Sequence, residues 1–358
     1  MRLYWVVGEL SGEMRAVSVI KVLRQLDPTI EMRGMGGELM ADLGVQLVAH
    51  WRDYAVVGFV EVFRQLPKFI RLYKRLQADI LAYHPHRIIL VDYPGLNLRL
   101  ARWAVRQGIE VTYFIPPQLW AWNPGRVRYL RHPAIQLLCI LPFEPNFYAR
   151  YGIEALYVGH PLVEEVRGIT PLSWPRPYIA LLPGSRFHEV RNMLPLMAKL
   201  PTVLPDWDFV VSRVKHLPLS LYQQLAPRLA VVEGQTYSLL AGAEAAVITS
   251  GTATLEAALI GTPSVIVYKG NYLSYLLAKQ LVRVPFIGLP NLILGEPVFP
   301  ELIQKDYNLP SLVKALGMQI AQREPVQAKL RTLRERLGEH SAAQIAAQAI
   351  LSSMRKKH

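Results

Sequence analysis

The chain is poor in cysteine and in long apolar runs, and both absences narrow its class. Its 358 residues include one cysteine, Cys139, which excludes a disulfide framework and a cysteine zinc site and fits a reducing cytosol. No apolar run has the length of a membrane-spanning helix, and residues 1–8 have the pattern of a first strand instead of a signal peptide. The nine histidines show no metal-ligand spacing, so we expect neither a metal nor a cofactor.

Acidic residues are scarce relative to basic ones. The chain has 40 Lys and Arg against 27 Asp and Glu, a formal net charge of +13 and an isoelectric point near 9.8. Such a balance is typical of proteins that bind nucleic acid, a membrane surface or a phosphorylated ligand. No zinc finger, RNA-binding aromatic signature or long basic tail is present, so we expect no nucleic acid and favour an anionic membrane and phosphate.

Short apolar runs alternate with helix-period segments in both halves of the chain, which predicts an α/β fold with two doubly wound, Rossmann-like domains. Ligands of such sheets bind outside the carboxyl ends of the strands, so we expect a cleft between the domains. A proline-rich stretch at 168–177 has no periodicity, which places the domains at 1–167 and 168–358. The expected strands span 3–8, 87–92, 111–115, 136–141, 155–158, 178–182, 208–212, 229–232, 245–249 and 264–268, and a long helical segment follows Glu324.

Two strand–turn–helix junctions in the second half predict seats for a diphosphate. In residues 181–190 an apolar run ends at Gly184-Ser185, and Arg186 follows directly before a helical pattern that includes Glu189. Free backbone amides at a helix start attract anions, and arginine adds a bidentate phosphate donor. Residues 249–256 repeat the arrangement with Ser250, Gly251, Thr252 and Thr254, and Glu256 is placed to accept hydrogen bonds from a ribose. Simple helix capping by serine and threonine explains part of the second pattern.

Two loops of the first half carry polar candidates. The loop 8–13 lacks G-x-G-x-x-G and contains two glutamates, so Ser11 and Gly12 either hydrogen-bond a ligand or form a turn with Ser11 as helix cap. Asp92 ends an apolar strand before a rigid Tyr-Pro-Gly turn. Its carboxylate is either a general base whose pKa is raised by burial, or a cap for the next helix.

Aromatic and amphipathic stretches indicate where a lipid would lie. Trp120 and Trp122 follow a strand in a proline-stiffened loop, where indoles pack on sugars or acyl chains or simply fill a core. Residues 54–76 mix apolar side chains with five basic ones, a composition suited either to an anionic membrane surface or to a helix packed on the sheet.

The chain resembles the lipid-A-disaccharide synthase family over nearly its whole length. The motifs that carry the resemblance occur in the family's order at residues 8–12, 34–37, 57–62, 92–97, 117–122, 141–144, 158–161, 181–190, 250–256 and 289–292. The chain departs from the family's usual residues at Glu13, Gly95 and Asn123.

The resemblance implies a GT-B glycosyltransferase without a metal. Such an enzyme joins UDP-2,3-diacylglucosamine to 2,3-diacylglucosamine 1-phosphate, giving a β-1,6-linked disaccharide 1-phosphate and UDP, at the cytoplasmic face of the inner membrane. A homodimer is one candidate assembly. Asp92 would be the base. Residues expected to bind substrate or UDP are Ser11, Gly12, Gly184, Ser185, Arg186, Glu189, Ser250, Gly251, Thr252, Thr254, Glu256 and Asn291. Residues expected to contact acyl chains or membrane are Val57, Phe59, Val60, Phe63, Phe69, Trp120 and Trp122.

Three other functions remain compatible with parts of the pattern. The first is a related protein that binds a UDP-sugar without catalysis, and the second is a transferase with a different acceptor. The third is a nicotinamide-dependent oxidoreductase, against which the missing G-x-G-x-x-G counts.

Overall fold

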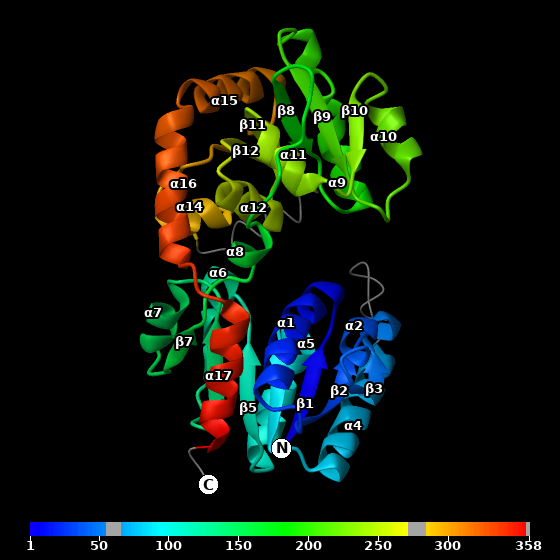
Figure 1. The fold of residues 1–358 in the computed structure, drawn as a ribbon, viewed down its shortest axis with the longest axis vertical. Coiled ribbons are helices and arrows are strands. Elements are labelled where there is room, and N and C mark those ends of the chain that lie inside the picture. Colours follow the sequence, from blue (N-terminus) through cyan, green and yellow to red (C-terminus); the bar gives the residue numbers. More distant parts are fainter. Residues whose placement is uncertain (55–65, 271–283, 356–358) are drawn as a thin grey trace. The chain divides into compact units, whose positions relative to one another are not determined.

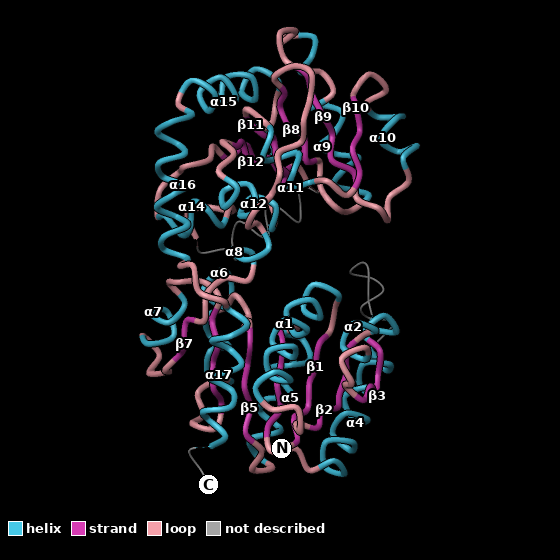
Figure 2. The backbone as a smooth tube through the Cα atoms, in the orientation of Figure 1, coloured by secondary structure: helices cyan, strands magenta, loops and turns pink. Residues whose placement is uncertain are grey.

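The computed structural model describes residues 1–54, 66–270 and 284–355, and the chain divides into two compact units. The first unit comprises Met1–Pro161 and His340–His358, and the second comprises Leu162–Glu339. Strands and helices alternate along each unit (Figures 1 and 2). The expected α/β class with two parallel sheets is confirmed. The assignment of the C-terminal segment differs from expectation, because residues 340–358 belong to the first unit instead of the second.

The first unit is built on a parallel sheet of seven strands in the order β3-β2-β1-β4-β5-β6-β7. Its elements are β1 Arg2–Val7, α1 Leu10–Leu26, β2 Glu31–Gly36, α2 Glu38–Ala41, β3 Gln46–His50, η1 Trp51–Tyr54, α4 Leu66–Tyr83, β4 Arg87–Val91, α5 Pro94–Arg106, β5 Glu110–Phe114, α6 Leu119–Trp122, η2 Pro124–Tyr129, β6 Ile135–Cys139, α7 Glu144–Ala149, β7 Ala155–Tyr157 and α17 Ala342–Arg355.

The second unit has a parallel sheet of six strands in the order β10-β9-β8-β11-β12-β13. Its elements are α8 Leu162–Glu165, β8 Tyr178–Leu182, α9 Phe187–Met197, η3 Leu200–Thr202, β9 Asp208–Arg213, α10 Leu219–Leu225, β10 Ala230–Glu233, α11 Thr236–Gly242, β11 Ala245–Thr249, α12 Thr252–Ile260, β12 Ser264–Tyr268, α14 Leu289–Leu294, β13 Glu301–Ile303, η4 Gln304–Asp306, α15 Leu309–Ala321 and α16 Arg323–Leu337.

Helices cover both faces of the first sheet, so its central strands are apolar on both sides. Tyr4 and Val6 of β1 pack in one cluster with side chains of α4 and α5. Leu3, Trp5 and Val7 pack in a second cluster with α1 and α17. A strand buried on both faces has a continuous apolar sequence, which is why β1 and β4 are recognisable in the sequence.

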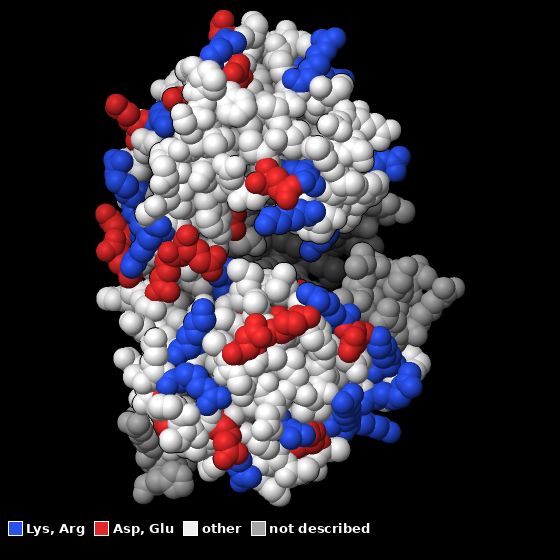
Figure 3. All heavy atoms as spheres, turned by 45° about the vertical axis from the view of Figure 1, so that its right-hand side comes forward, with Lys and Arg blue, Asp and Glu red and all other residues white. Residues whose placement is uncertain are grey.

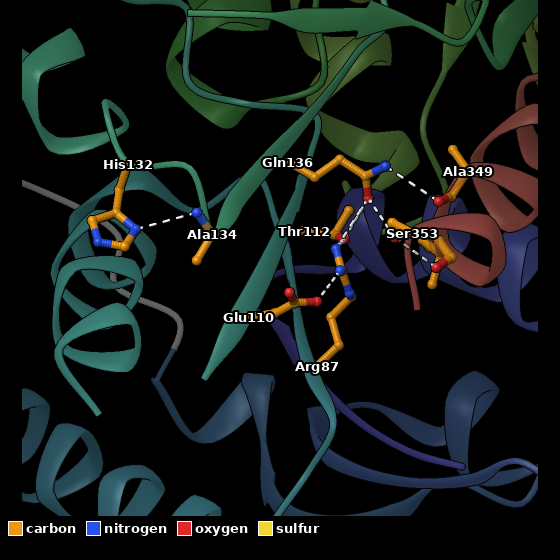
Figure 4. A network of polar contacts seen from close by, with 9 residues as sticks. Arg87, Glu110, Thr112, His132, Ala134, Gln136, Ala349 and Ser353 are labelled. Atoms are coloured by element: carbon orange, nitrogen blue, oxygen red, sulfur yellow. Dashed lines mark hydrogen bonds and ion pairs between the residues drawn. The ribbon is translucent and has the colours of Figure 1, made fainter. Parts of the chain in front are cut away.

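Helix α17 is attached to the first sheet by apolar and polar contacts. It lies beside α1 (Figure 1), with Ala346, Ala347 and Ile350 fully buried. Figure 4 shows the polar contacts, which link β4, β5, β6 and α17. Arg87 pairs with Glu110 and donates to Thr112 Oγ1 at 3.0 Å and Gln136 Oε1 at 3.3 Å. Gln136 Nε2 donates to the Ala349 carbonyl at 3.2 Å, and the Ser353 hydroxyl donates to Gln136 Oε1 at 3.5 Å.

The structure differs from the sequence-based elements at several places. Strands β2, β3 and β13 were not expected; β2 mixes charged residues with glycines and so has no apolar run. The long helix expected after Glu324 is two helices, because Gly338, at φ +72°, follows the end of α16. Helix α1 begins at Leu10 with Glu9 at its N-cap, so Ser11 lies inside the first turn and is not the cap.

Truncating the apolar face of α17 should destabilise the first unit. Ile350→Ala removes a fully buried side chain and should cost about 2–5 kcal/mol of unfolding free energy. Hydrogen exchange should then show faster exchange of the β1 and β4 amides. The exposed neighbour Gln348 provides the control Gln348→Ala. Equal protection in both variants would contradict this role of α17.

Candidate active site

The candidate residues lie at the point in each sheet where the strand order reverses, so that successive strands are added on the other side. In the first unit β1 pairs with β2 on one side and β4 on the other, and in the second unit β8 pairs with β9 and β11. Ligands of doubly wound sheets bind outside the carboxyl ends of strands at such switch points. Loop 8–12 and Asp92 follow β1 and β4, whereas residues 184–186 and 250–252 follow β8 and β11. Each unit thus contains one candidate site.

Asp92 lies in a strained turn that its neighbours hold in place. Asp92 and Tyr93 have φ values of +45° and +50°, a left-handed conformation that costs energy for residues other than glycine. The Asp92 carbonyl accepts hydrogen bonds from Asn97 Nδ2 and from the Tyr113 hydroxyl, both at 2.8 Å. Tyr93, not Asp92, is the N-cap of α5, without a side-chain capping bond. The capping alternative for Asp92 is therefore wrong.

The surroundings of the Asp92 carboxyl favour its protonated form. Burial raises its pKa to about 6, the charge of Glu9 adds to the increase, and a hydrogen bond from the Tyr93 backbone opposes it. The loop after β1 approaches closely, since a Cβ at Gly8 would lie 2.1 Å from the Tyr93 ring. A carboxyl group with a pKa near 6 is suited to accept a proton near neutral pH.

The other polar residues of the first loop are engaged within the protein. Ser11 donates its hydroxyl hydrogen to the Glu9 carboxylate, and Gly12 is buried. Glu13 is fully buried, accepting from the Met40 backbone at 3.0 Å and from Trp51 Nε1 at 2.7 Å. Glu13 therefore positions the segments after β2 and β3.

The two tryptophans after β5 have different surroundings. Trp120 packs edge-on against Phe143 with ring centres 4.9 Å apart, and its Nε1 donates to Glu144 Oε1 at 3.1 Å. Trp122 is 41% exposed, with the Arg126 guanidinium 5.1 Å from its ring centre. Glu144 also accepts from the Leu141 backbone at 3.0 Å, yet burial raises its pKa to about 7. Trp120 is thus a packed residue, whereas Trp122 offers a free face.

The second unit contains a pocket of about 860 Å³ that collects most of the expected UDP-binding residues. Those lining it are Gly184, Ser185, Arg186, Glu189, Ser250, Gly251, Thr252 and Glu256. Thr254 and Asn291 lie elsewhere and are fully buried. The Thr254 hydroxyl donates to the Gly251 carbonyl at 2.8 Å, and Asn291 Nδ2 donates to the Phe299 carbonyl at 2.8 Å. The Thr254 side chain therefore stabilises the turn at Gly251, and the Asn291 side chain stabilises the segment at Phe299.

The anion seat expected at the Gly-Ser turn is occupied by a side chain of the protein itself. The backbone amides of Ser185 and Arg186 donate to Glu189 Oε2 at 2.9 and 3.1 Å. Gly184 allows this approach, because a Cβ there would lie 2.6 Å from the Glu189 Cβ. The Ser185 amide, expected to face a phosphate, thus donates to Glu189 in this structure. The Arg186 guanidinium pairs with Glu189 at 2.9 Å but remains 71% exposed, so it can still reach an anion.

The start of α12 retains the features of an anion seat. Its N-cap Gly251 makes no side-chain capping bond, and Ser250 and Thr252 line the pocket beside it. The hydroxyl of Thr249, also in the pocket lining, is buried without a hydrogen-bond partner among the described residues. Uncapped amides at a helix N-terminus favour negative charge.

The same pocket has a further polar segment, residues 234–238, that was not among the residues expected from the sequence. Residues 234–238 follow β10 and line the pocket, with Ser212 at the end of the adjacent strand β9. The Tyr237 hydroxyl donates to Glu256 Oε1 at 3.3 Å, and the Ser212 and Thr236 hydroxyls are 2.8 Å apart. The Gly-Gln-Thr-Tyr-Ser sequence of residues 234–238, directly after a strand, was the signal in the sequence that could have identified this segment.

Only part of the expected lipid-contact stretch can be placed. Val57, Phe59, Val60 and Phe63 lie outside the described residues. In α4, Leu72 and Leu76 are buried in the core, Phe69 is half-buried, and Arg71, Lys74 and Arg75 are exposed. The described part of this stretch is thus a helix packed on the sheet with a basic outer side.

Metal-ligand clusters and membrane-spanning helices are both absent from the described parts of the chain. No three His, Cys, Asp or Glu side chains lie together as metal ligands within residues 1–54, 66–270 and 284–355. No helix in those ranges is both long and apolar enough to cross a membrane.

Comparison with known proteins identifies the family. Residues 3–352 match the family model described as lipid-A-disaccharide synthetase. The chain belongs to the lipid-A-disaccharide synthetase family. It is 37% identical to the lipid-A-disaccharide synthase of Syntrophus aciditrophicus, covering 98% of this chain and 97% of that one. It is 36% identical to that of Myxococcus xanthus, with coverage of 98% and 97%.

Solved structures of low sequence identity share the fold. The calicheamicin glycosyltransferase CalG4 matches with a TM-score of 0.65 and 16% identity over 99% of this chain and 98% of that chain. The UDP-GlcNAc 2-epimerase of Neisseria meningitidis matches with a TM-score of 0.65 and 11% identity over 98% and 100%. The expected GT-B class is thereby confirmed, and family membership confirms a glycosyltransferase of lipid A synthesis instead of an oxidoreductase.

The buried Glu144 should make stability depend on pH. Its pKa is raised from the usual 4.5 to about 7, so the folded state binds this proton more tightly than the unfolded state. The free energy of unfolding should therefore decrease as pH rises from about 4.5 to 7, by roughly 3 kcal/mol for this group. Glu144→Gln should remove that contribution in urea unfolding, whereas the exposed Glu154→Gln should keep it. Parallel pH curves for parent and Glu144→Gln would contradict the assignment.

Proposed function

We propose that this chain joins UDP-2,3-diacylglucosamine to 2,3-diacylglucosamine 1-phosphate with Asp92 as general base, with inversion and without a metal ion. Membership of the lipid-A-disaccharide synthetase family supports the substrates. The observation that carries the mechanism is the Asp92 carboxyl, held in a strained turn at a switch point with a pKa near 6.

The base acts on the acceptor. Asp92 takes the proton of the acceptor's 6-hydroxyl while that oxygen attacks the anomeric carbon of the donor. The bond between that carbon and the diphosphate oxygen breaks, and UDP leaves with the electron pair. A single displacement places the new bond on the opposite face of the sugar, which turns an α-linked donor into a β-1,6 linkage. Burial, and after it the charge of Glu9, raises the pKa of the Asp92 carboxyl and so makes it basic enough for this transfer.

The donor binds in the pocket of the second unit. Arg186 and the uncapped start of α12, from Gly251 to Ala253, stabilise the negative charge of the departing diphosphate. This role falls to α12 because Glu189 occupies the amides of the Gly184-Ser185 turn. Glu256, oriented by Tyr237, accepts hydrogen bonds from the ribose. A guanidinium and oriented amides thus supply the positive potential for which other transferases use a divalent cation.

Replacing Asp92 should remove most turnover. Asp92→Asn should lower kcat by roughly 10²–10⁴-fold, the usual contribution of a general base. In the parent, kcat/KM should rise with pH through about 6 and level off above it, because the base must be deprotonated. Disaccharide and UDP are measured with both acylated substrates, detergent and EDTA. The exposed Asp42→Asn is the control. Normal turnover by Asp92→Asn, or loss of parental activity in EDTA, would contradict the mechanism.

We further propose that the protein acts as a peripheral enzyme on the cytoplasmic face of an anionic membrane, since both substrates are lipids. Exposed basic residues of α4, namely Arg71, Lys74 and Arg75, support this. Figure 3 shows Lys and Arg side chains gathered toward the right-hand edge of the first unit, the lower part of that view. Each basic residue near an anionic surface contributes about 1 kcal/mol of attraction.

Neutralising these residues should weaken membrane binding. Arg71→Gln/Lys74→Gln/Arg75→Gln should lower partitioning onto anionic vesicles about 100-fold at low salt, with UDP affinity unchanged. Co-sedimentation measures the partitioning. A control of equal charge change combines Arg228→Gln, Lys314→Gln and Arg331→Gln, three exposed residues of the second unit. If both triple variants sediment like the parent, α4 makes no membrane contact.

A further inference from the structure

A groove of about 760 Å³ runs from the Asp92 turn along the surface between α4 and α5. At one end it is lined by Gly8, Glu9 and Tyr93, the residues that surround Asp92. Its walls include Phe69 and Tyr73 of α4 together with Leu96 and Trp103 of α5. The groove is therefore continuous with the proposed catalytic turn and has the apolar, aromatic lining that suits acyl chains.

Three arginines of α5 line the same groove. Arg99, Arg102 and Arg106 follow each other at intervals of three and four residues and so share one side of the helix. All three are exposed. Within the described ranges no carboxylate pairs with any of their guanidinium groups; Arg102 instead stacks on Tyr129, 4.6 Å from the ring centre. A row of unpaired guanidinium groups beside an apolar wall is suited to a phosphate.

The positive charges of Arg99, Arg102 and Arg106 all act on Tyr73. Its hydroxyl donates to the Arg99 carbonyl at 3.4 Å. Burial raises the pKa of Tyr73, and the positive charges of Arg99, Arg102 and Arg106 oppose that increase. The positive potential is thus directed at the apolar wall of the groove around Tyr73.

The groove has opposite charge at its two ends. Asp92 and Glu9 lie at one end. Helix α5 leads away from them and rises about 1.5 Å per residue, so Arg99 and Arg106 lie roughly 8 and 18 Å beyond Pro94 along the axis. An anionic group is repelled beside Asp92 and attracted farther along the helix.

From this polarity we infer that the groove binds the acceptor lipid, with its 1-phosphate on Arg99 and its acyl chains along the α4 wall. The inference rests on the proposed function. The 1-phosphate and the CH₂OH group of the 6-hydroxyl are borne by the two ring carbons that flank the ring oxygen, so a phosphate held at Arg99 fixes the end of the ring that carries the 6-hydroxyl and can turn that hydroxyl toward Asp92. Arg102 and Arg106 draw the anion into the groove. The difference in charge between the two ends of the groove thereby determines which hydroxyl group of the acceptor sugar reaches Asp92.

The test compares Arg99→Gln with the parent and with Arg331→Gln, an exposed arginine of the second unit. Calorimetry in detergent micelles, without donor, measures binding of 2,3-diacylglucosamine 1-phosphate and of the same lipid lacking its phosphate. Arg99→Gln should weaken binding of the phosphorylated lipid about 10- to 100-fold, as expected for a lost charged hydrogen bond. It should leave the phosphate-free lipid unaffected. In the assay, KM for the acceptor should rise and kcat should fall, because the 6-hydroxyl is less well oriented toward Asp92, while the KM for the donor stays unchanged.

The apolar wall is tested separately by Ile70→Ser, a change at a groove residue that is 48% exposed and so leaves the core intact. This variant should weaken both lipids equally. If Arg99→Gln and Ile70→Ser bind both lipids like the parent while turnover is normal, the groove assignment is wrong and the proposed function stands. If the parent binds with the expected dependence on Arg99 yet forms no disaccharide, the groove assignment stands and the proposed function is wrong. If Arg99→Gln weakens only sedimentation with anionic vesicles, the groove takes bilayer phospholipid and the inference is overturned.

Discussion

The reversal of winding at the centre of each parallel sheet is the constraint on which the candidate site depends. Loops after β1 and β4 leave neighbouring strands on opposite faces of the sheet, as do those after β8 and β11, so backbone amides and side chains converge at those edges. Residues as distant in sequence as Gly8 and Tyr93 come into contact there. The second unit repeats the arrangement with Gly184–Arg186 and Gly251. One topology, used twice, places the proposed base in one unit and the proposed donor pocket in the other.

Buried carboxylates fix the loops around these edges. Glu13 accepts hydrogen bonds from Met40 and Trp51, and Glu189 from Ser185 and Arg186. A buried polar group is tolerated when it is hydrogen-bonded, and each of these carboxylates meets backbone or indole donors of a loop. Asp92 differs, because among the causes of its pKa only the Tyr93 backbone donor favours the charged form, against burial and Glu9. Similar side chains thus become structural acceptors or a base according to the donors around them.

Much of the fold was predictable from the sequence, because strands buried on both faces have continuous apolar sequences. Strands at the edges of the sheets were harder to predict, because β2 and β3 lack continuous apolar runs. The packing of α17 on the first sheet was also hard to predict, because it depends on contacts between residues far apart in sequence. The positions of Asp92 and of most residues that line the pocket of the second unit were predictable from the rule that ligands bind at the carboxyl ends of strands. The hydrogen bond from the Ser185 amide to Glu189 was not predictable. The sequence of residues 185–189 is compatible both with free amides and with amides paired to a side chain until the side-chain directions are known. The segment 234–238 was missed because its Gly-Gln-Thr-Tyr-Ser sequence, although it follows a strand, is also common in turns and helix starts that bind no ligand.

The basic character of the chain has two physical consequences that differ in range. Exposed charges such as Arg71 and Lys74 act through a diffuse potential that salt screens within about 10 Å at 0.1 M ionic strength. Arg99 is also exposed but stands beside the apolar wall of the groove, so a phosphate held there would meet it through short, directional hydrogen bonds as well as through its charge. Under the proposed membrane association, attraction to an anionic surface would concentrate the enzyme where its lipid substrates are, without fixing their orientation. In the inferred acceptor complex, orientation would instead come from the separation of Glu9 from the α5 arginines along one groove.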